Sequence, residues 1–340
     1  MGANSNKIVD LFGKGSTLKD KFGREMKTLR LSVTDRCDLK CRYCMPEEGV
    51  SWLGKNELLT FEEKILAVET LVELGIDRIK ITGGEPLLYS RLTELVERLS
   101  RLPLKDLSLT TNGTHLATLA LPLKKAGLKR VTVSLDSTDE KRFKSITRGG
   151  SLKKVWNGLM AAEEAGLTPL KINCVVLKEN QEDVVELARL TLEHPWEIRF
   201  IEYMPVTASV NLERSEGVPP REVKRTIEEV FGKLEPLSGY AHAPSADYRL
   251  PNAMGKIGFI SSVSDSFCSR CDRLRLSADG FLKLCMAHAD GLALKPLLQE
   301  GVPVEALKER IQGAVFHKPE GHSFWYTTPA PGEAMSRIGG

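Results

Sequence analysis

The sequence has no apolar run long enough to cross a membrane. Hydrophobic residues make up 41% of the 340 residues, but charged residues interrupt them before the roughly 18 in a row that suggest a spanning helix. The first 27 residues carry charges throughout and contain no apolar segment of the kind found in secretory signals. We therefore expect a cytoplasmic protein that has no membrane partner.

A strong excess of charge of either sign is also missing. The 48 Lys and Arg residues stand against 45 Asp and Glu residues and leave a net charge of +3, which is too small to predict nucleic-acid binding. A balance this close to neutral still permits a local basic pocket for an anionic small molecule. We expect no nucleic-acid partner.

The cysteines do not have the arrangement of a disulfide framework. There are seven, an odd number, and they fall along the chain as three, one and three. Two tight groups of this kind are typical of metal binding in a reducing compartment. The single cysteine between them, Cys174, lies in an expected strand, where it reads as a small buried hydrophobe.

Strand and helix patterns alternate over the first two thirds of the chain. Six short apolar or alternating segments are predicted to be strands, at about 29–34, 78–82, 106–111, 130–135, 170–176 and 197–203. Alternation with short connections predicts a parallel sheet with helices outside it. Six units are too few for a closed eight-fold barrel, which leaves an open partial barrel or a doubly wound sheet.

The helical segments between these strands carry their own signals. Thr60 and Glu63 form a capping box ahead of a helix that should end at Gly75. Further helices are expected at about 92–99, 115–126, 151–165 and 181–193. Pro122 weakens the second of these, and Asn180 is expected to cap the last.

The alternation stops at about residue 206, which suggests a division of the chain. Residues 1–28 are expected to be a loose polar arm, 29–205 the strand–helix core, and 206–340 a C-terminal extension. The extension is expected to contain a helix at 221–231, irregular chain at 238–256, short strands of a second module at 258–263, 272–276 and 281–284, and a helix at 303–313.

Three cysteines, Cys37, Cys41 and Cys44, form a C-x3-C-x2-C loop directly after the first expected strand. Thiolate sulfur is a soft ligand that suits zinc or an iron–sulfur cluster. Structural zinc normally has four protein ligands, and this loop supplies three, so one metal position would stay open for a substrate. A zinc site completed by a distant residue, or simple buried thiols, are the alternatives, although no histidine lies near the loop.

This loop resembles that of the radical S-adenosylmethionine (SAM) enzymes, in which an aromatic residue, here Tyr43, precedes the last cysteine. The resemblance implies an α/β fold with an open, six-unit β/α barrel of the TIM type. It also implies a 4Fe–4S cluster on the three cysteines, with SAM on the fourth iron. One electron from the cluster would then cleave SAM to methionine and a 5′-deoxyadenosyl radical, while the protein supplies binding and orientation.

Other positions match SAM-binding residues of this family. Gly83, Gly84 and Glu85 begin a Gly-Gly-Glu-Pro turn after a strand, where glycine lets the backbone approach a ligand closely. Such a turn alone is a weak signal, but the resemblance implies that it binds the amino group of SAM. On the same basis Ser134 is expected at the SAM carboxylate or ribose and Met204 against the adenine.

A second set of three cysteines, Cys268, Cys271 and Cys285, lies in the extension. By spacing alone it could be a zinc site with His288 as the fourth ligand. The stretch from Phe267 to Ser277 closely resembles one radical SAM subfamily, the GTP 3′,8-cyclases, which are lyases that catalyse the first step of molybdenum cofactor biosynthesis. The resemblance extends over nearly the whole chain after about residue 10, including the terminal Gly-Gly.

In that subfamily the second cluster is also 4Fe–4S, and its open iron binds the purine of GTP. The resemblance implies a GTP cavity between the clusters; the matching residues are Arg30, Lys80, Thr111, Lys171, Arg273, Leu274 and Arg275. A triphosphate requires clustered arginine and lysine. Lys80 departs from the arginine usual in the subfamily, which keeps the charge but loses the bidentate fork.

The implied reaction converts GTP to 3′,8-cyclo-7,8-dihydro-GTP. The deoxyadenosyl radical takes hydrogen from ribose C3′, and the C3′ radical attacks C8 of guanine and is then reduced. Residues matching those that assist at the GTP end are Arg199, Arg273, Arg275, Gly339 and Gly340. A terminal Gly-Gly would ordinarily be a frayed end, but here we expect the tail to insert into the active site.

The resemblance also implies partners: a reductase or other electron donor, the downstream cyclic pyranopterin monophosphate synthase, and a second copy of the chain in a homodimer. The nearest rival is a two-cluster radical SAM enzyme that modifies a peptide, which would not need the Arg273 and Arg275 pair. A non-enzymatic zinc or nucleotide-binding module is the rival from another class, and it would never cleave SAM.

Overall fold

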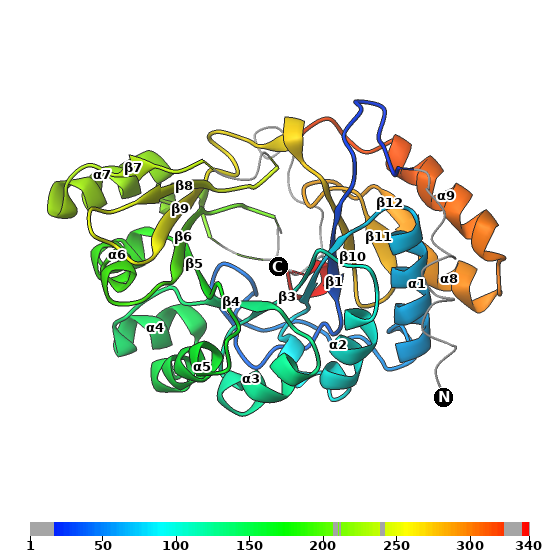
Figure 1. The fold of residues 1–340 in the computed structure, drawn as a ribbon, viewed down its shortest axis with the longest axis horizontal. Helices are drawn as coiled ribbons and strands as arrows, with labels where there is room; N and C mark the ends of the chain where they lie inside the picture. The colour runs from blue at the N-terminus through cyan, green and yellow to red at the C-terminus, as the bar shows by residue number, and fades with distance from the viewer. Residues whose placement is uncertain (1–16, 207–209, 211, 239–241, 323–334, 340) are drawn as a thin grey trace, which may run out of the picture.

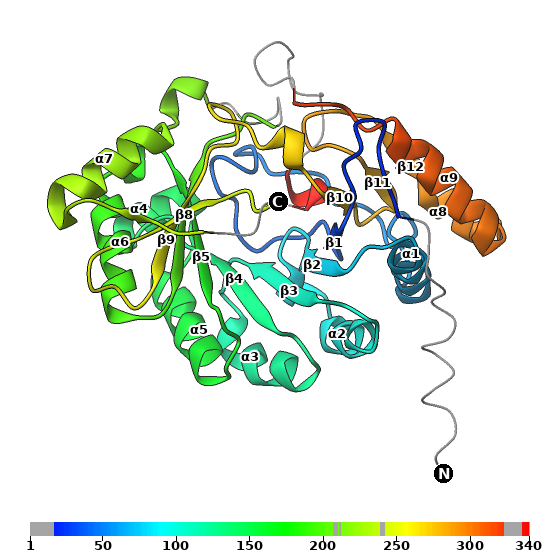
Figure 2. The same ribbon diagram turned by 45° about the horizontal axis from the view of Figure 1, so that its top comes forward.

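A single twelve-stranded sheet organises the chain (Figure 1). The computed structural model describes residues 17–206, 210, 212–238, 242–322 and 335–339. The strand order is β12-β11-β10-β1-β2-β3-β4-β5-β6-β9-β8-β7. The middle eight strands, from β10 to β9 in that order, run parallel to their neighbours. The sheet curves into a barrel, as Figure 2 shows. The barrel is open, because its outermost strands, β12 and β7, do not pair with each other in the described part of the chain.

The six central strands lie within two residues of their predicted bounds. They are β1 (Thr28–Ser32), β2 (Arg78–Thr82), β3 (Asp106–Thr111), β4 (Arg130–Ser134), β5 (Lys171–Val176) and β6 (Glu197–Glu202). Their alternate apolar residues, such as Leu29, Leu31 and Ile79, are fully buried in the core under the outer helices. The strands from β1 to β6 are neighbours in sequence order, without the reversal of order that a doubly wound sheet has, which confirms the open partial barrel.

Helices cover the outer face of these strands (Figure 2). They are α1 (Phe61–Glu73), α2 (Leu92–Ser100), α3 (Leu116–Lys125), α4 (Glu140–Thr147), α5 (Leu152–Glu164) and α6 (Asp183–Glu193). The capping box is confirmed, since the Thr60 hydroxyl accepts from Glu63 N at 3.1 Å and the Glu63 carboxylate accepts from Thr60 N at 2.7 Å. Pro122 lies inside α3 without ending it. No helix among the described residues is both long and apolar enough to span a bilayer.

Helix α4 was not predicted from the sequence. The Asp139 side chain accepts a hydrogen bond from Arg142 N at 2.8 Å and so caps its first turn. The segment is short and mostly polar, so it lacks the repeated apolar positions from which the other helices were predicted. Its apolar residues Phe143 and Ile146 are buried.

Asn180 does not cap α6, contrary to the prediction; Glu182 occupies that position. Asn180 is instead fully buried. Its Nδ2 donates to Asp136 O at 2.6 Å and Val175 O at 3.0 Å, and its Oδ1 accepts from Leu177 N at 2.7 Å. The side chain thus ties the end of β4 to the end of β5.

Replacement of Asn180 by alanine is expected to lower the free energy of unfolding by about 3 kcal/mol, because it leaves buried backbone groups without partners. Asn157 is exposed on α5 and provides the control. Asn157→Ala should change the free energy by no more than about 0.5 kcal/mol. Denaturant titration of both variants measures the difference, and equal effects would refute a tying role for Asn180.

The extension does not form a separate module, which corrects the prediction. On one edge β9 (Lys256–Ile260) pairs with β6 and is followed in the sheet by β8 (Ala246–Arg249) and β7 (Glu235–Pro236). On the other edge β10 (Arg273–Leu276) pairs with β1 and is followed by β11 (Phe281–Lys283) and β12 (Gly291–Ala293). Strand β8 also lies within the stretch expected to be irregular.

The described residues of the extension form four further helices. They are α7 (Pro220–Phe231), α8 (Leu294–Gln299), α9 (Val304–Phe316) and α10 (Met335–Ile338). Helix α7 packs on α6, and α8 and α9 lie beside α1. Short 3-10 turns include η2 (Pro86–Leu88), η3 (Lys178–Asn180), η4 (Arg214–Glu216) and η5 (Cys268–Arg270).

The described part of the N-terminal arm is packed rather than loose. Leu18 and Met26 are buried in the core. Leu18 N donates to Leu74 O at 3.1 Å, and Met26 N donates to Leu18 O at 2.8 Å. Residues 1–16 lie outside the described residues, so the expectation for the arm is wrong only for 17–27.

Candidate active site

Two sets of three thiols lie at opposite ends of the parallel strands. We call Cys37, Cys41 and Cys44 the first thiol set and Cys268, Cys271 and Cys285 the second thiol set. The first set follows the carboxyl end of β1. The second set lies at the opposite end, because two of its members precede β10, which is parallel to β1, and the third follows the antiparallel β11. At about 3.3 Å per residue, a five-residue strand leaves roughly 15 Å of barrel between the two ends.

The Gly-Gly turn is pressed against the chain that leads into the first thiol set. Gly84 N donates to Thr34 O at 2.7 Å, and Glu85 N donates to Arg36 O at 2.7 Å. A Cβ on Gly84 would lie 2.5 Å from Asp35 O, which is closer than real Cβ atoms come. Glycine is required here by the protein's own backbone, before any ligand is considered.

Glu85 lies at the centre of a buried hydrogen-bond cluster. Its Oε1 accepts from Leu87 N at 2.9 Å and from the Thr111 hydroxyl at 2.7 Å, and its Oε2 accepts from Asn112 N at 2.7 Å. Burial raises the pKa of Glu85 to about 7. Thr111 therefore lies against Glu85, apart from the basic side chains with which the sequence resemblance grouped it.

Tyr43, Ser134 and Met204 all lie at the edge of the barrel that carries the first thiol set. The Tyr43 hydroxyl donates to Asp136 Oδ2 at 2.7 Å, and Asp136 Oδ1 accepts from Val175 N at 2.8 Å. Ser134 ends β4, and Met204 follows β6 by two residues; both are partly buried. Asp136 was missed as a site residue, although an acidic residue just after a strand was a readable signal.

The thiols of the first set are buried enough to be protonated in the metal-free protein. Burial raises the pKa of Cys37 and Cys44 to about 12 and raises that of Cys41 well above its ordinary value. In the second set, burial raises the pKa of Cys285. Metal binding must therefore displace protons from sulfur.

The donor chemistry of both sets fits an iron–sulfur cluster. Each set offers three soft sulfur ligands, and all six cysteines are free of disulfides. Asn112 Nδ2 lies 4.0 Å from Cys37 Sγ. Within the described residues, no three His, Cys, Asp or Glu side chains close around the position of a single metal ion. His288, considered as a zinc ligand, has its Nε2 2.9 Å from Gly321 O.

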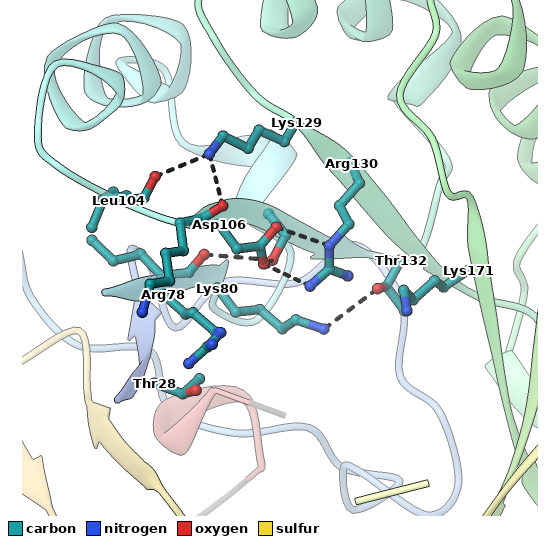
Figure 3. Close-up of polar contacts among 12 residues, drawn as sticks. Thr28, Arg78, Lys80, Leu104, Asp106, Lys129, Arg130, Thr132 and Lys171 are labelled. Carbon is teal, nitrogen blue, oxygen red and sulfur yellow. Dashed lines mark hydrogen bonds and ion pairs between the residues drawn. The ribbon is translucent and has the colours of Figure 1, made fainter. Parts of the chain in front are cut away.

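Cationic side chains line the inside of the barrel between the two thiol sets, and Figure 3 shows three of them, Lys80, Arg130 and Lys171. Arg30 on β1 stands in register with Lys80 on β2 and with Arg275 on β10. Across the barrel, Lys171 and Arg199 project from β5 and β6. Lys80 reaches across β3 toward the Thr132 hydroxyl, 3.4 Å from its Nζ.

Crowding of these cations in a buried space depresses their pKa values. Burial is the largest cause, and the neighbouring positive charges add to it. The pKa of Lys80 falls well below its ordinary value, that of Lys171 to about 8 and that of Arg275 to about 10. A buried space in which several cations lie close together is suited to a polyanionic ligand.

Carboxylates hold part of this cationic lining in place. Arg130 grips Asp106 with two hydrogen bonds of 2.9 and 2.6 Å. Glu197 forms a close ion pair with Lys171 and lies 3.2 Å from both Arg199 and Lys256. Sequence reasoning missed Arg130, Asp106 and Glu197, whose shared signal was a charged residue at the first position of a strand.

The C-terminal tail ends inside the barrel, as Figures 1 and 2 show. Gly339 is buried with a φ of +73°, and its carbonyl accepts a close hydrogen bond from Arg275 Nη1. A Cβ on Gly339 would overlap the Thr82 hydroxyl. Gly340 lies outside the described residues.

Of the three residues of β10 assigned to GTP, Arg273 and Arg275 lie on one face of the strand and Leu274 on the other. The Arg273 guanidinium stacks 4.7 Å from the Phe267 ring centroid and lies 3.9 Å from the Asp272 carboxylate. Arg275 Nη2 lies 3.0 Å from Met286 Sδ. Leu274 is fully buried in the core, so only its backbone is available to a ligand in the barrel.

Comparison with known families and proteins agrees with this geometry. Residues 31–191 match the family model described as the radical SAM superfamily, and residues 196–324 match that described as Molybdenum Cofactor Synthesis C. The chain is 42% identical to the GTP 3′,8-cyclase of Listeria monocytogenes over 90% of this chain and 92% of the relative. It is 43% identical to the GTP 3′,8-cyclase of Moorella thermoacetica over 95% of this chain and the whole relative.

Among solved structures, the fold is similar to that of SuiB from Streptococcus suis, bound to its precursor peptide SuiA. The TM-score is 0.62 at 15% identity, covering 91% of this chain and 75% of that one. This likeness concerns the fold alone.

Proposed function

The chain belongs to the GTP 3′,8-cyclase family of the radical SAM superfamily, and on this premise we propose that it converts GTP to 3′,8-cyclo-7,8-dihydro-GTP in the first step of molybdenum cofactor biosynthesis. The observation that carries the proposal is a cationic barrel interior lying between two three-thiol sets. Such an interior can hold a triphosphate while each end of the barrel keeps a metal position for a substrate.

Both thiol sets would hold a 4Fe–4S cluster with one iron left open. The chemistry supplied at the first set is one-electron cleavage of SAM, which yields a radical able to take hydrogen from ribose C3′. The residues proposed to bind and orient SAM there are Tyr43, Gly83, Gly84, Glu85, Ser134 and Met204. Tyr43 is oriented by Asp136, and the Gly-Gly turn holds the cysteine loop at the barrel mouth.

The GTP end consists of the cations between the thiol sets. Residues proposed to bind the triphosphate or base are Arg30, Lys80, Lys171, Arg273, Arg275 and the backbone of Leu274, with Arg199 assisting. Thr111 is assigned by the family match alone, because its hydroxyl bonds to Glu85. Gly339 accepts from Arg275, so the tail would orient that guanidinium and help to exclude water, with Gly340 assigned the same role from the sequence.

The affinity for GTP is expected to fall as the pH rises through about 8. Burial and the cations around it lower the pKa of Lys171 to about 8, so the side chain is protonated below that pH and neutral above it. Because a triphosphate favours the protonated form, the dissociation constant should rise about tenfold between pH 7 and 9, as linkage of one proton requires. Equilibrium binding of GTP to the metal-free protein measures this. Lys171→Arg should flatten the dependence, and a flat profile for the unaltered protein would refute it.

The proposed reaction is tested by release of 5′-deoxyadenosine from anaerobically reconstituted protein with SAM and a reductant, with and without GTP. Iron and sulfide are counted on the same sample. Strong stimulation by GTP, with about eight irons per chain, is the expected result. Cleavage independent of GTP at the same iron content would indicate a different substrate, such as a peptide. About four irons and one zinc would refute the second cluster.

We also propose partners and domain boundaries. The reaction needs a one-electron donor, its product would be consumed by a downstream cyclic pyranopterin monophosphate synthase, and the family match suggests a homodimer. Seven free cysteines suit the reducing cytoplasm. We retain 29–205 as the radical SAM core and 206–340 as the extension, with 1–28 as an N-terminal segment.

A further inference from the structure

A buried arginine near the N-terminus holds three separate segments together. The Arg24 side chain is only 8% exposed. Its Nη1 donates to the carbonyls of Cys268 and Glu320, each at 2.7 Å, and its Nη2 donates to Pro319 O at 2.6 Å. Its Nε donates to Asp20 Oδ2 at 2.6 Å. One guanidinium thus joins the N-terminal turn, the second thiol set and the segment that follows α9.

Asp20 fixes the direction of this guanidinium. Its carboxylate is fully buried. Oδ1 accepts from the backbone N of both Phe22 and Arg24 at 2.9 Å, which closes the turn, while Oδ2 takes the Arg24 Nε. Charge-assisted bonds of this kind are short and directional, so the fork is aimed before any metal binds.

Lys318 makes a second set of contacts with the chain that carries the second thiol set. It is 2% exposed, and its Nζ donates to Arg273 O at 2.9 Å and closely to Leu284 O. Leu284 directly precedes Cys285, and Arg273 follows Cys271 by two residues. A buried ammonium therefore ties together the two stretches of chain that carry these cysteines.

The loop that carries Cys268 and Cys271 is a short turn: Arg270 N donates to Phe267 O at 3.1 Å, and His242 Nδ1 lies 3.1 Å from Arg270 O. Cys268 begins the three-residue turn η5, and Cys271 N donates to Cys268 O at 3.1 Å. Arg24 donates to that same carbonyl. The arginine therefore holds the turn on which the spacing of two of the three thiols depends.

We propose that Asp20, Arg24 and Lys318 form a clamp that positions the second thiol set for its cluster. Around the second thiol set Arg24 and Lys318 donate to backbone carbonyl oxygens, so they fix the backbone without competing for sulfur. These residues are positioning residues, because none is proposed to touch the substrate. The inference rests on the proposed function in one respect: it takes Cys268, Cys271 and Cys285 as cluster ligands.

The test is made on the reconstituted full-length protein. Wild type and Arg24→Lys, which keeps the charge but loses the fork, are treated with a ferrous chelator and iodoacetamide, and alkylation of each cysteine is followed by peptide mass spectrometry. We expect the second thiol set of Arg24→Lys to be alkylated about tenfold faster, as loss of a residue that orients metal ligands implies. The first thiol set in the same molecules is the internal control and should keep its wild-type rate.

Two further variants repeat the test at the other clamp residues, and a third variant, at a surface arginine, serves as a matched control. Asp20→Asn and Lys318→Met should give the same selective acceleration, and either one carries the test if Arg24→Lys does not fold. Arg91 makes a comparable fork with Glu94 on the exposed surface, with two bonds of 2.7 Å. Arg91→Lys should leave both thiol sets at wild-type rates.

Failure of the clamp and failure of the proposed function give different results. Unchanged rates in all three clamp variants, or equal acceleration of both thiol sets, would overturn the clamp. If reconstitution does not slow alkylation of the second set in the wild-type protein, that set holds no metal. The second cluster of the proposed function then fails, and the clamp with it.

Discussion

Gly84→Ala is expected to abolish cleavage of SAM and to remove the cluster at the first thiol set. A Cβ at this position would lie 2.5 Å from Asp35 O, in the backbone that leads to Cys37, so the cysteine loop or the turn must move. Displacement of a reacting centre by about 1 Å can lower a rate about 10²-fold. We expect a fall in SAM cleavage of at least that size, with iron reduced from about eight to about four per chain.

The control for this variant is Gly313→Ala. Gly313 lies inside α9, where a Cβ would meet nothing within 4 Å, and alanine is the better helix former. Iron content and SAM cleavage should stay at wild-type values. If Gly84→Ala also retained eight irons and full cleavage, the close contact between the Gly-Gly turn and the cysteine loop would not support the first cluster.

Gly339→Ala is expected to stop cyclisation of GTP while leaving the clusters intact. The residue has a φ of +73°, and an added Cβ would overlap the Thr82 hydroxyl, so the tail must leave its position beside Arg275. We expect GTP turnover to fall about 10²-fold, because the guanidinium at the GTP end loses its backbone partner. Iron content and SAM cleavage without GTP should not change.

Gly232→Ala separates backbone strain from displacement of the tail. Gly232 follows α7 with a φ of +85°, but a Cβ there would meet no atom within 4 Å. The variant should lose about 1–2 kcal/mol of stability and keep its turnover. Equal turnover in Gly339→Ala and wild type would contradict an active-site role for the tail.

The core fold could be predicted because its signals are local. Each central strand alternates buried apolar residues with interior polar ones, and the capping box at Thr60 and Glu63 lies within four residues of sequence. The cysteine spacings and the Gly-Gly turn are also short patterns. Their meaning as cluster sites came from the family resemblance, since spacing alone left zinc open for both sets.

What the sequence did not predict depends on strand register and on contacts distant in sequence. Glu197 could not be paired with Lys256 before β6 and β9 were known to be neighbours. Asn180 resembled a helix cap because it directly precedes a helical segment. Its partner Asp136 lies 44 residues away, so no local pattern in the sequence indicated their hydrogen bond. Arg24 lay in a segment that its polar composition suggested was loose, although its partner at Cys268 fixes it.

The extension was misjudged for a similar reason. Its strands are short and separated from the core in sequence, so they suggested a second module. Strand β10 in fact pairs with β1, the first strand of the core, and β9 pairs with β6, the last. This pairing is what brings the second thiol set to the opposite end of the same barrel and Arg275 into register with Arg30.

The most direct test of the central claim follows a single hydrogen atom. The reconstituted protein is supplied with SAM, a reductant and GTP deuterated at ribose C3′, and the 5′-deoxyadenosine released is analysed by mass spectrometry, with GTP deuterated at C2′ as the control. A GTP bound between the two thiol sets for cyclisation should transfer one deuterium from C3′ and none from C2′. Deuterium-free 5′-deoxyadenosine from C3′-labelled GTP would contradict the account.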